Sequence, residues 1–171
     1  MDHLYTPWRY QFIRAIKAGA ECIFCLAAST GQATREEQQA EDRERLVLYR
    51  GNQVFVILNR FPYTNGHLMI APFAHVADLA SCPVPLLAEI MELAKRAETA
   101  LRDTYHPDGF NIGLNLGKSA GAGVEGHLHL HVVPRWVGDA NFVSVIGETR
   151  LLPEELETTY DKLFLLFSRQ A

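Results

Sequence analysis

The chain has only three cysteines among its 171 residues, an odd number that argues against a disulfide framework and favours a reducing cytoplasm. It has no run of about 18 uncharged apolar residues, so no membrane-spanning helix is expected. Its formal net charge is −4, which excludes a broad basic surface for nucleic acid. The first 18 residues lack an apolar stretch long enough for a secretory signal. We therefore expect a cytoplasmic protein that binds neither membrane nor nucleic acid.

The composition is that of an ordinary globular protein. Apolar residues make up 48% and charged residues 21%, which excludes a disordered chain, a collagen-like fibre and a coiled coil. At this length about 70% of the unfolded surface can be buried, so one domain with a substantial core is expected. The segment from Ser29 to Glu44 is polar and charged throughout, and we interpret it as a mobile loop or a frayed helix.

Short strand-like runs occur in groups, with one long helical stripe between them. Strands are expected over Leu46–Tyr49, Val54–Leu58, His67–Ala71, Phe110–Leu116 and Gly126–Pro134, and Phe142–Ile146 is a further short candidate. Apolar periodicity predicts a helix from Pro85 to Tyr105, and Pro153 with nearby glutamates predicts a closing helix to Ser168. Because helices do not follow every strand, the pattern favours an α+β fold with an antiparallel sheet of about five strands.

Three histidines stand at every second position in the segment Gly126–Pro134. They are His127, His129 and His131. By chance, such a triple would occur in about one chain in ninety at this histidine content. On a strand, the three imidazoles share one face and the intervening apolar residues pack on the core from the other.

A single metal ion is one interpretation of this row, but the outer two side chains start about 13 Å apart on a strand. Two of the histidines could share an ion, whereas coordination by all three would require sharply splayed rings. The middle residue, His129, is flanked on both sides, which suits a nucleophile whose neighbours bind the charge that it attacks. Three solvated histidines without a function remain a further alternative.

A glycine-rich segment precedes the histidine row, with five glycines in the fourteen residues from Gly113 to Gly126. Glycines allow backbone N–H groups to approach an anion closely. A Walker A assignment of Gly117-Lys118-Ser119 fails, because the required first glycine would stand at Ile112 and a strand follows. Alone, the segment is more typical of a flexible hairpin connection, but its place ahead of the histidines favours a phosphate site.

The pair Cys22-x-x-Cys25 is typical of half a zinc site or of a redox pair. A thioredoxin-like role lacks the required βαβ context. A tetrahedral zinc site would need two further ligands, and the sequence leaves open which histidines supply them. The third cysteine, Cys82, is interpreted as a plain thiol.

The pattern His-φ-His-φ-His-φ-φ, with φ apolar, resembles the signature of the histidine triad (HIT) family of nucleotide hydrolases and transferases. Other blocks are similar to those of the family in the same order: Cys22–Cys25, Phe55–Pro62, Gly66–Pro72 and Phe73–His75. The resemblance covers about residues 21–136. Three further blocks, Gly113–Gly121, Val132–Trp136 and Gly138–Phe142, resemble the bacterial diadenosine tetraphosphate phosphorylase-like branch.

The resemblance implies a single HIT domain over residues 1–171, with a core at 21–136, an N-terminal extension at 1–20 and a C-terminal extension at 137–171. It implies that His129 attacks the α-phosphorus of a nucleotide and carries a covalent nucleotidyl intermediate. The implied nucleotide-binding residues are Asn59 at the ribose, Asn115 at the phosphate near the scissile bond, and Ser119, Gly121, Gly123 and His131 around the phosphates. Gly121–Gly126 departs from the common Gly-Gln-Ser/Thr-Val pattern of the family.

The resemblance also implies a structural zinc ion held by Cys22, Cys25, His75 and His127, and no organic cofactor. The expected substrate is a dinucleoside polyphosphate or a nucleoside phosphoramidate, cleaved by a phosphorylase or a hydrolase. A homodimer is expected, with a tetramer as an alternative. Two other functions stay open: a metal-dependent hydrolase or oxygenase that uses triad histidines as ligands, and a nucleotide-binding regulator without turnover.

Overall fold

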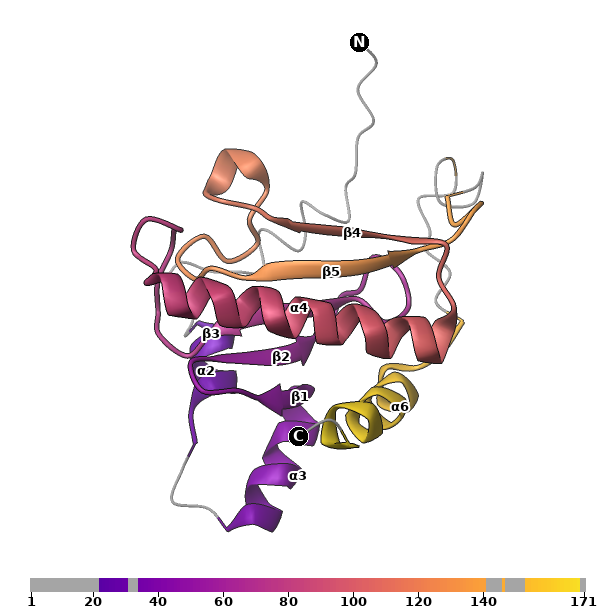
Figure 1. Cartoon of the computed structure of the whole chain (residues 1–171), viewed down its shortest axis with the longest axis horizontal. Helices are drawn as coiled ribbons and strands as arrows, with labels where there is room; N and C mark the ends of the chain where they lie inside the picture. Colours follow the sequence, from indigo (N-terminus) through magenta and orange to yellow (C-terminus); the bar gives the residue numbers. More distant parts are fainter. Residues whose placement is uncertain (1–21, 31–33, 141–145, 147–152, 170–171) are drawn as a thin grey trace.

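The protein is built around a five-stranded antiparallel sheet, seen in a computed structural model that describes residues 22–30, 34–140, 146 and 153–169 (Figure 1). The strand order is β1-β2-β3-β5-β4, and every pairing is antiparallel. The strands are β1 (Val47–Arg50), β2 (Val54–Leu58), β3 (Leu68–Pro72), β4 (Gly109–Leu114) and β5 (Leu130–Arg135). The predicted α+β class is therefore confirmed. Within the described residues, no helix has the length and hydropathy that crossing a bilayer would require.

One long helix, α4 (Val84–Tyr105), lies across the face of the sheet that is turned to the viewer in Figure 1. It begins one residue before the predicted start and ends at Tyr105, as predicted; the next residue, His106, takes a left-handed conformation with φ 47°. Its buried stripe faces strands β2, β3 and β5. The stripe consists of Leu86, Ile90, Leu93, Ala94, Ala97, Ala100 and Leu101. Burial of each large apolar side chain contributes about 1.5–3 kcal/mol, which fixes the helix on the sheet.

The polar segment that we expected to be mobile or frayed contains a regular helix, α3 (Arg35–Arg45). It buries no residue, so it shows no apolar stripe that periodicity could detect. A capping box starts it: the Thr34 hydroxyl accepts the N–H of Glu37, and the Glu37 carboxylate accepts the N–H of Thr34. Leu46 ends it in a left-handed conformation, φ 65°, so β1 begins at Val47 and not at Leu46.

Two further helices complete the described chain. Helix α6 (Leu156–Arg169) packs on α4 and β1, and its Tyr160 hydroxyl donates to the Val47 carbonyl at 3.1 Å. It corresponds to the predicted closing helix, but it begins at Leu156, three residues after Pro153. The candidate strand Phe142–Ile146 lies outside the described residues except for Ile146. The short helix α2 (Ile23–Ala28) was not expected; it lies on the far side of the sheet in Figure 1.

The histidine strand starts later than the alternating pattern predicts. Strand β5 begins at Leu130, where its pairing with β3 begins, and not at Gly126. Ahead of it, the Leu128 N–H donates to the Val76 carbonyl at 2.6 Å and thus leaves the sheet ladder. His127 and His129 therefore lie just before β5, in a segment that contacts the chain just after β3. His127 and His129 thus precede the paired strand, whereas His131 lies within it.

Candidate active site and metal centre

The ring of His129 is held by its own neighbour. Its Nδ1 lies 2.7 Å from the His127 carbonyl oxygen, so Nδ1–H donates and the lone pair resides on Nε2. His129 Nε2 has no hydrogen-bond partner among the described residues, and the residue as a whole is 5% exposed. The intervening apolar residues are buried as predicted: Leu128, Leu130 and Val132.

His131 is oriented by a fourth histidine. The backbone N–H of Tyr63 donates to His67 Nδ1 at 3.1 Å, so the proton of neutral His67 resides on Nε2. His67 Nε2 lies 2.9 Å from His131 Nδ1 and donates to it. Neutral His131 therefore carries its proton on Nε2. His129 therefore presents a lone pair on Nε2, and His131 presents an N–H donor on Nε2. Attack on a phosphorus atom requires both a nucleophile and donors for the phosphoryl oxygens.

His67 could not be identified from the sequence as an active-site residue; the sequence placed it in a strand, in a family block and among the histidines available to a metal site. It is fully buried, and its partner His131 is 64 positions away in the chain. Asn59 belongs to the same network. Its Oδ1 accepts the N–H of Phe61 at 2.9 Å, and its Nδ2 lies 3.3 Å from His67 Nδ1. Beyond these two contacts, the Asn59 amide has a second lone pair and a second N–H with which a ribose could be bound. A ribose contact by Asn59 stays a prediction.

Burial keeps both reactive imidazoles neutral. Burial lowers the pKa of His129, and the hydrogen bond to the His127 carbonyl only partly opposes this. Burial, assisted by the nearby His129, lowers the pKa of His131 to about 4. A neutral imidazole is the nucleophilic form. The site is therefore set for nucleophilic chemistry at neutral pH without an added base.

Two cysteines and two histidines converge at the start of the histidine segment. They are Cys22, Cys25, His75 and His127, whose ligand atoms all lie within 4.8 Å of one another. His127 Nδ1 is 3.4 Å from Cys22 Sγ, 3.6 Å from Cys25 Sγ and 3.3 Å from His75 Nδ1. Cys25 Sγ lies 3.2 Å from His75 Nδ1. One imidazole nitrogen cannot form three hydrogen bonds at once, so this is the geometry of a ligand set.

The donor set fits zinc. A tetrahedral ion with Zn–S near 2.3 Å and Zn–N near 2.1 Å separates its ligand atoms by about 3.3–3.8 Å, close to the observed spacing. His127 Nε2 donates to the Pro72 carbonyl at 2.8 Å, which leaves Nδ1 as the lone-pair donor and orients the ring. Gly126 leaves room for the site, since a Cβ there would lie 3.2 Å from His75 Nε2.

The predicted phosphate-binding loop follows β4 on the side of the reactive histidines. In the β4–β5 pairing, Gly113 is opposite His131 and Leu114 is opposite Leu130. Because β4 ends at Leu114 and β5 begins at Leu130, Asn115 and His129 both lie just beyond this last pair, and the role of Asn115 at the phosphate stays a prediction. A Cβ on Gly113 would meet nothing within 4 Å, so the space beside His131 is open.

The remaining loop residues lie farther along the same connection. Ser119 belongs to a short 3₁₀ turn, η1 (Lys118–Ala120), and is exposed. Gly121 follows it with φ 84°, a conformation that favours glycine, and Gly123 is half-buried. Their roles at the phosphates stay predictions. The structure thus brings together the four candidate metal ligands and the pair His129 and His131, and adds His67.

The comparisons with known proteins agree with this geometry. The family model of the HIT domain matches residues 40–137. The "AP-4-A phosphorylase" of Mycobacterium tuberculosis strain H37Rv is 39% identical over 170 residues, which cover 99% of this chain and 86% of the relative. A zinc-bound histidine triad family protein from Mycobacterium smegmatis has a TM-score of 0.65 at 29% identity and covers 88% of this chain and 95% of its own.

A Plasmodium falciparum diadenosine triphosphate hydrolase, 19% identical with a TM-score of 0.58 over 74% of this chain and 76% of its own, shares the fold. Both the family model and the 39% identical relative span the histidine segment that carries the site. The chain is therefore a member of the histidine triad (HIT) family and resembles its AP-4-A phosphorylase.

Proposed function

We propose that the protein is a nucleotidyltransferase that cleaves dinucleoside polyphosphates, with diadenosine tetraphosphate as substrate and inorganic phosphate as acceptor. The observation that carries the proposal is the His129 imidazole, whose pKa is lowered by burial, whose Nδ1–H is held by the His127 carbonyl and whose Nε2 has no partner among the described residues. The 39% identical relative is named for a phosphorylase of this substrate, which favours phosphate over water as the acceptor.

In the first step, the Nε2 lone pair of His129 attacks the α-phosphorus. The phosphorus–nitrogen bond forms as the bond to the bridging oxygen breaks, and the nucleoside polyphosphate leaves with that electron pair. Negative charge on the phosphoryl oxygens increases in the transition state, and fixed donors stabilise it. The Nε2–H of His131 is one such donor, set by His67. Asn115 and the loop around Gly121 and Gly123 would supply others.

In the second step, an oxygen of inorganic phosphate attacks the same phosphorus atom and the phosphorus–nitrogen bond breaks. The electron pair returns to Nε2, so His129 is regenerated. With diadenosine tetraphosphate the products of the two steps are ATP and ADP. With water as the acceptor they would be ATP and AMP. The imidazole thus acts in both steps.

We propose further that zinc occupies the cluster of Cys22, Cys25, His75 and His127, where it would act as a cross-link. Structural zinc contributes directly to folding stability. Only one triad histidine, His127, is part of a potential metal group among the described residues. A hydrolase or oxygenase that binds its metal through two triad histidines therefore has no support from this geometry.

The direct test is incubation of the protein with diadenosine tetraphosphate, with and without inorganic phosphate. The proposal predicts ADP and ATP, dependent on phosphate, and loss of turnover in His129→Ala with its metal content retained. AMP and ATP in the presence of phosphate would identify a hydrolase. Bound nucleotide without product would identify a regulator, and activity restored by iron or manganese after chelation would identify a metal-dependent enzyme.

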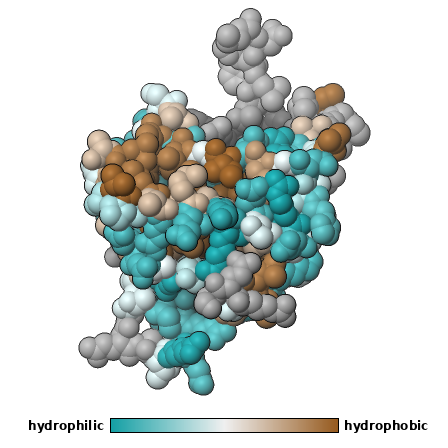
Figure 2. Space-filling view, in the orientation of Figure 1, coloured by the Kyte–Doolittle hydropathy of each residue, from teal (hydrophilic) through white to brown (hydrophobic). Residues whose placement is uncertain are grey.

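A homodimer is proposed as the assembly. Strand β4 is at the edge of the sheet, and its Ile112 is exposed. Val84 and Met91 on α4 are exposed as well, and Figure 2 shows a hydrophobic area at the upper left, over the N-terminal half of α4. Pairing of two β4 edges would cover this surface. Light scattering is expected to show a dimer for the wild type and a monomer for Ile112→Lys, whereas a wild-type monomer would contradict the proposal.

A further inference from the structure

The aromatic ring of Phe24, in helix α2, packs against two histidines of the triad. Phe24 is 1% exposed. Its ring centroid lies 4.7 Å from that of His129, at an interplanar angle of 32°, and 5.1 Å from that of His127, at 41°. The His129 ring also meets His131 edge-on at 4.9 Å. The reactive imidazole therefore contacts both a histidine oriented by His67 and a phenyl ring.

We propose that α2 is a positioning element, in which Phe24 holds the His129 imidazole in the orientation that presents Nε2, while the cysteine–histidine cluster and Arg50 hold the two ends of the helix. The proposal rests on the proposed role of His129 as the nucleophile. Phe24 is a positioning residue, since it acts on the reacting atoms through its contact with His129.

Helix α2 cannot hold this position by its own stability. It has six residues, and its N-cap Cys22 makes no side-chain capping bond. Isolated helices shorter than about 12–15 residues are marginal in water. Its outward residues Ile23 and Leu26 are exposed, and only Phe24 and Ala27 are buried. The placement of Phe24 therefore depends on what fixes the two ends of the helix.

The cluster fixes the N-terminal end. Cys22 and Cys25 stand on either side of Phe24 in the chain, and their sulfur atoms lie 3.4 Å and 3.6 Å from His127 Nδ1. With both sulfurs bound to one ion, the backbone that carries Phe24 would be fixed at two points, 102 and 105 residues away in the chain from His127. The ring is thereby held against the segment that carries the reactive histidine.

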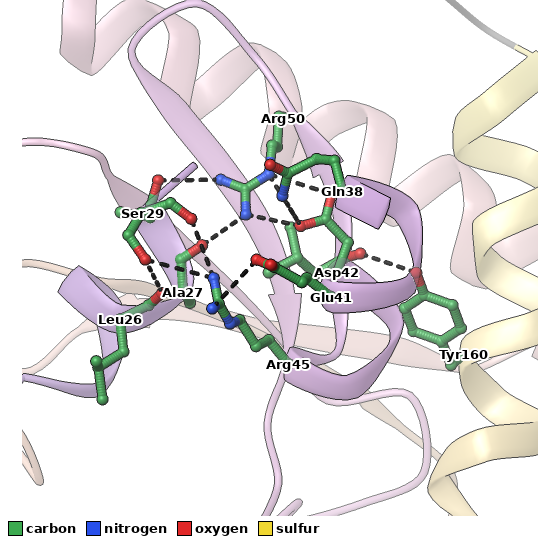
Figure 3. Close-up of polar contacts among 11 residues, drawn as sticks. Leu26, Ala27, Ser29, Gln38, Glu41, Asp42, Arg45, Arg50 and Tyr160 are labelled. Atoms are coloured by element: carbon green, nitrogen blue, oxygen red, sulfur yellow. Dashed lines mark hydrogen bonds and ion pairs between the residues drawn. The ribbon is translucent and has the colours of Figure 1, made fainter. Parts of the chain in front are cut away.

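Arg50 fixes the C-terminal end, as Figure 3 shows. Its guanidinium donates to the carbonyls of Ala27, at 2.6 Å, and Ala28, at 3.2 Å, which are groups that a helix end leaves unsatisfied. The same guanidinium binds the Asp42 carboxylate of α3 at 2.7 Å through Nη2 and at 3.0 Å through Nε. Both side chains are about five-sixths buried, at 16% and 15% exposed, so solvent screens this pair little.

The two anchors give the metal an indirect role in catalysis. The ion would not touch substrate, but its loss would free the N-terminal end of α2 and loosen Phe24 from His129. A displacement of about 1 Å at a reacting group can lower a rate 100-fold. Chelation should then disturb the His129 ring through Phe24, and should disturb it little further once Phe24 has been replaced.

The test compares Phe24→Leu with a matched control, Phe167→Leu. Phe167 is also fully buried, but it lies in α6 against Tyr49 on β1, at the edge of the sheet opposite β4. We expect Phe24→Leu to lower kcat for diadenosine tetraphosphate about 10-fold with KM within about threefold. Phe167→Leu should leave both within about twofold. Phe24→Met, whose unbranched side chain is longer and more adaptable, is measured alongside in case the leucine variant does not fold.

A second readout does not depend on activity. In protein labelled with ¹⁵N-histidine, the Nδ1–H proton of His129 should give a sharp NMR peak, because the His127 carbonyl protects it. The peak should broaden by exchange in Phe24→Leu and in chelated wild type, stay sharp in Phe167→Leu, and change no further when Phe24→Leu is chelated. An unchanged peak and unchanged kcat in both Phe24 variants would refute the positioning role. The expected peak changes in a protein without turnover would instead refute the proposed function and support the positioning role.

Discussion

The hydrogen bond from His67 to His131 can be removed without emptying the site, because asparagine and glutamine each mimic one of the two imidazole nitrogens. In His67→Asn, the amide can replace Nδ1 and still accept the Tyr63 N–H, but nothing reaches His131. In His67→Gln, the amide nitrogen can replace Nε2 and still donate to His131 Nδ1, which lies 2.9 Å from His67 Nε2 in the wild type. Only the asparagine variant should release His131 from its fixed tautomer.

The expected loss has two limits. A hydrogen bond between neutral groups contributes about 1 kcal/mol, which corresponds to roughly fivefold in rate. Complete loss of one donor to a developing oxyanion costs about 10²–10³-fold in kcat. Because His131 keeps its proton but loses its orientation, we expect His67→Asn to lower kcat about 10- to 100-fold. His67→Gln should stay within about fivefold of the wild type.

Steady-state kinetics with diadenosine tetraphosphate and phosphate measures the difference. Both variants alter the same buried position, so a loss due only to destabilisation would affect them alike, and thermal melts of the two proteins provide the control. Equal kcat values for the asparagine and glutamine variants, at equal stability, would refute the tautomer argument.

Three further predictions concern stability. Zinc at about 100 times its dissociation constant would contribute about 2.7 kcal/mol, so chelation should lower Tm by about 5–10 °C, and Cys25→Ser should abolish the response; a chelator-insensitive wild type would contradict the metal site. Arg50→Ala leaves the Asp42 carboxylate unpaired and should lower the free energy of unfolding by about 2–3 kcal/mol, less than a fully buried pair, with a loss under about 0.5 kcal/mol contradicting the anchor. Burial would raise the pKa of Glu154, but hydrogen bonds from Lys162, Tyr105 and Thr159 lower it to about 2. Its carboxylate therefore stabilises the fold above pH 4.5 and loses this effect as the pH falls towards 2, so Glu154→Gln should destabilise the protein more at pH 7 than at pH 3, and equal losses would contradict the assignment.

Local patterns predicted the parts of the fold that depend on local periodicity. The apolar stripe of α4 and the strand β2 follow directly from residue spacing, and the alternation around His129 identified the buried face. Helix α3 has no apolar stripe, so its only local signal was the capping pair Thr34 and Glu37. The start of β5 could not be predicted, because Leu128 leaves the ladder for a carbonyl 52 residues earlier in the chain, that of Val76.

The site shows the same division. The histidine row and Cys22-x-x-Cys25 are visible locally, but the metal site needs the fold to bring the cysteines to His127, over 100 residues away. Spacing alone could not select His75, and the resemblance to the family supplied it. His67 could not be assigned a role because its function depends on contact with His131. Sequence patterns therefore located the reactive groups, whereas their tautomers required the structure.

In the proposed mechanism, one imidazole nitrogen becomes bonded to phosphorus during each turnover. The most direct measurement mixes enzyme with diadenosine tetraphosphate without phosphate, quenches within one turnover into alkali, where the phosphorus–nitrogen bond survives, and maps the adduct by peptide mass spectrometry. We expect an adenylyl group on His129, which disappears when phosphate is added. ATP release in a single turnover with no adduct, or with an adduct on any other residue, would contradict it.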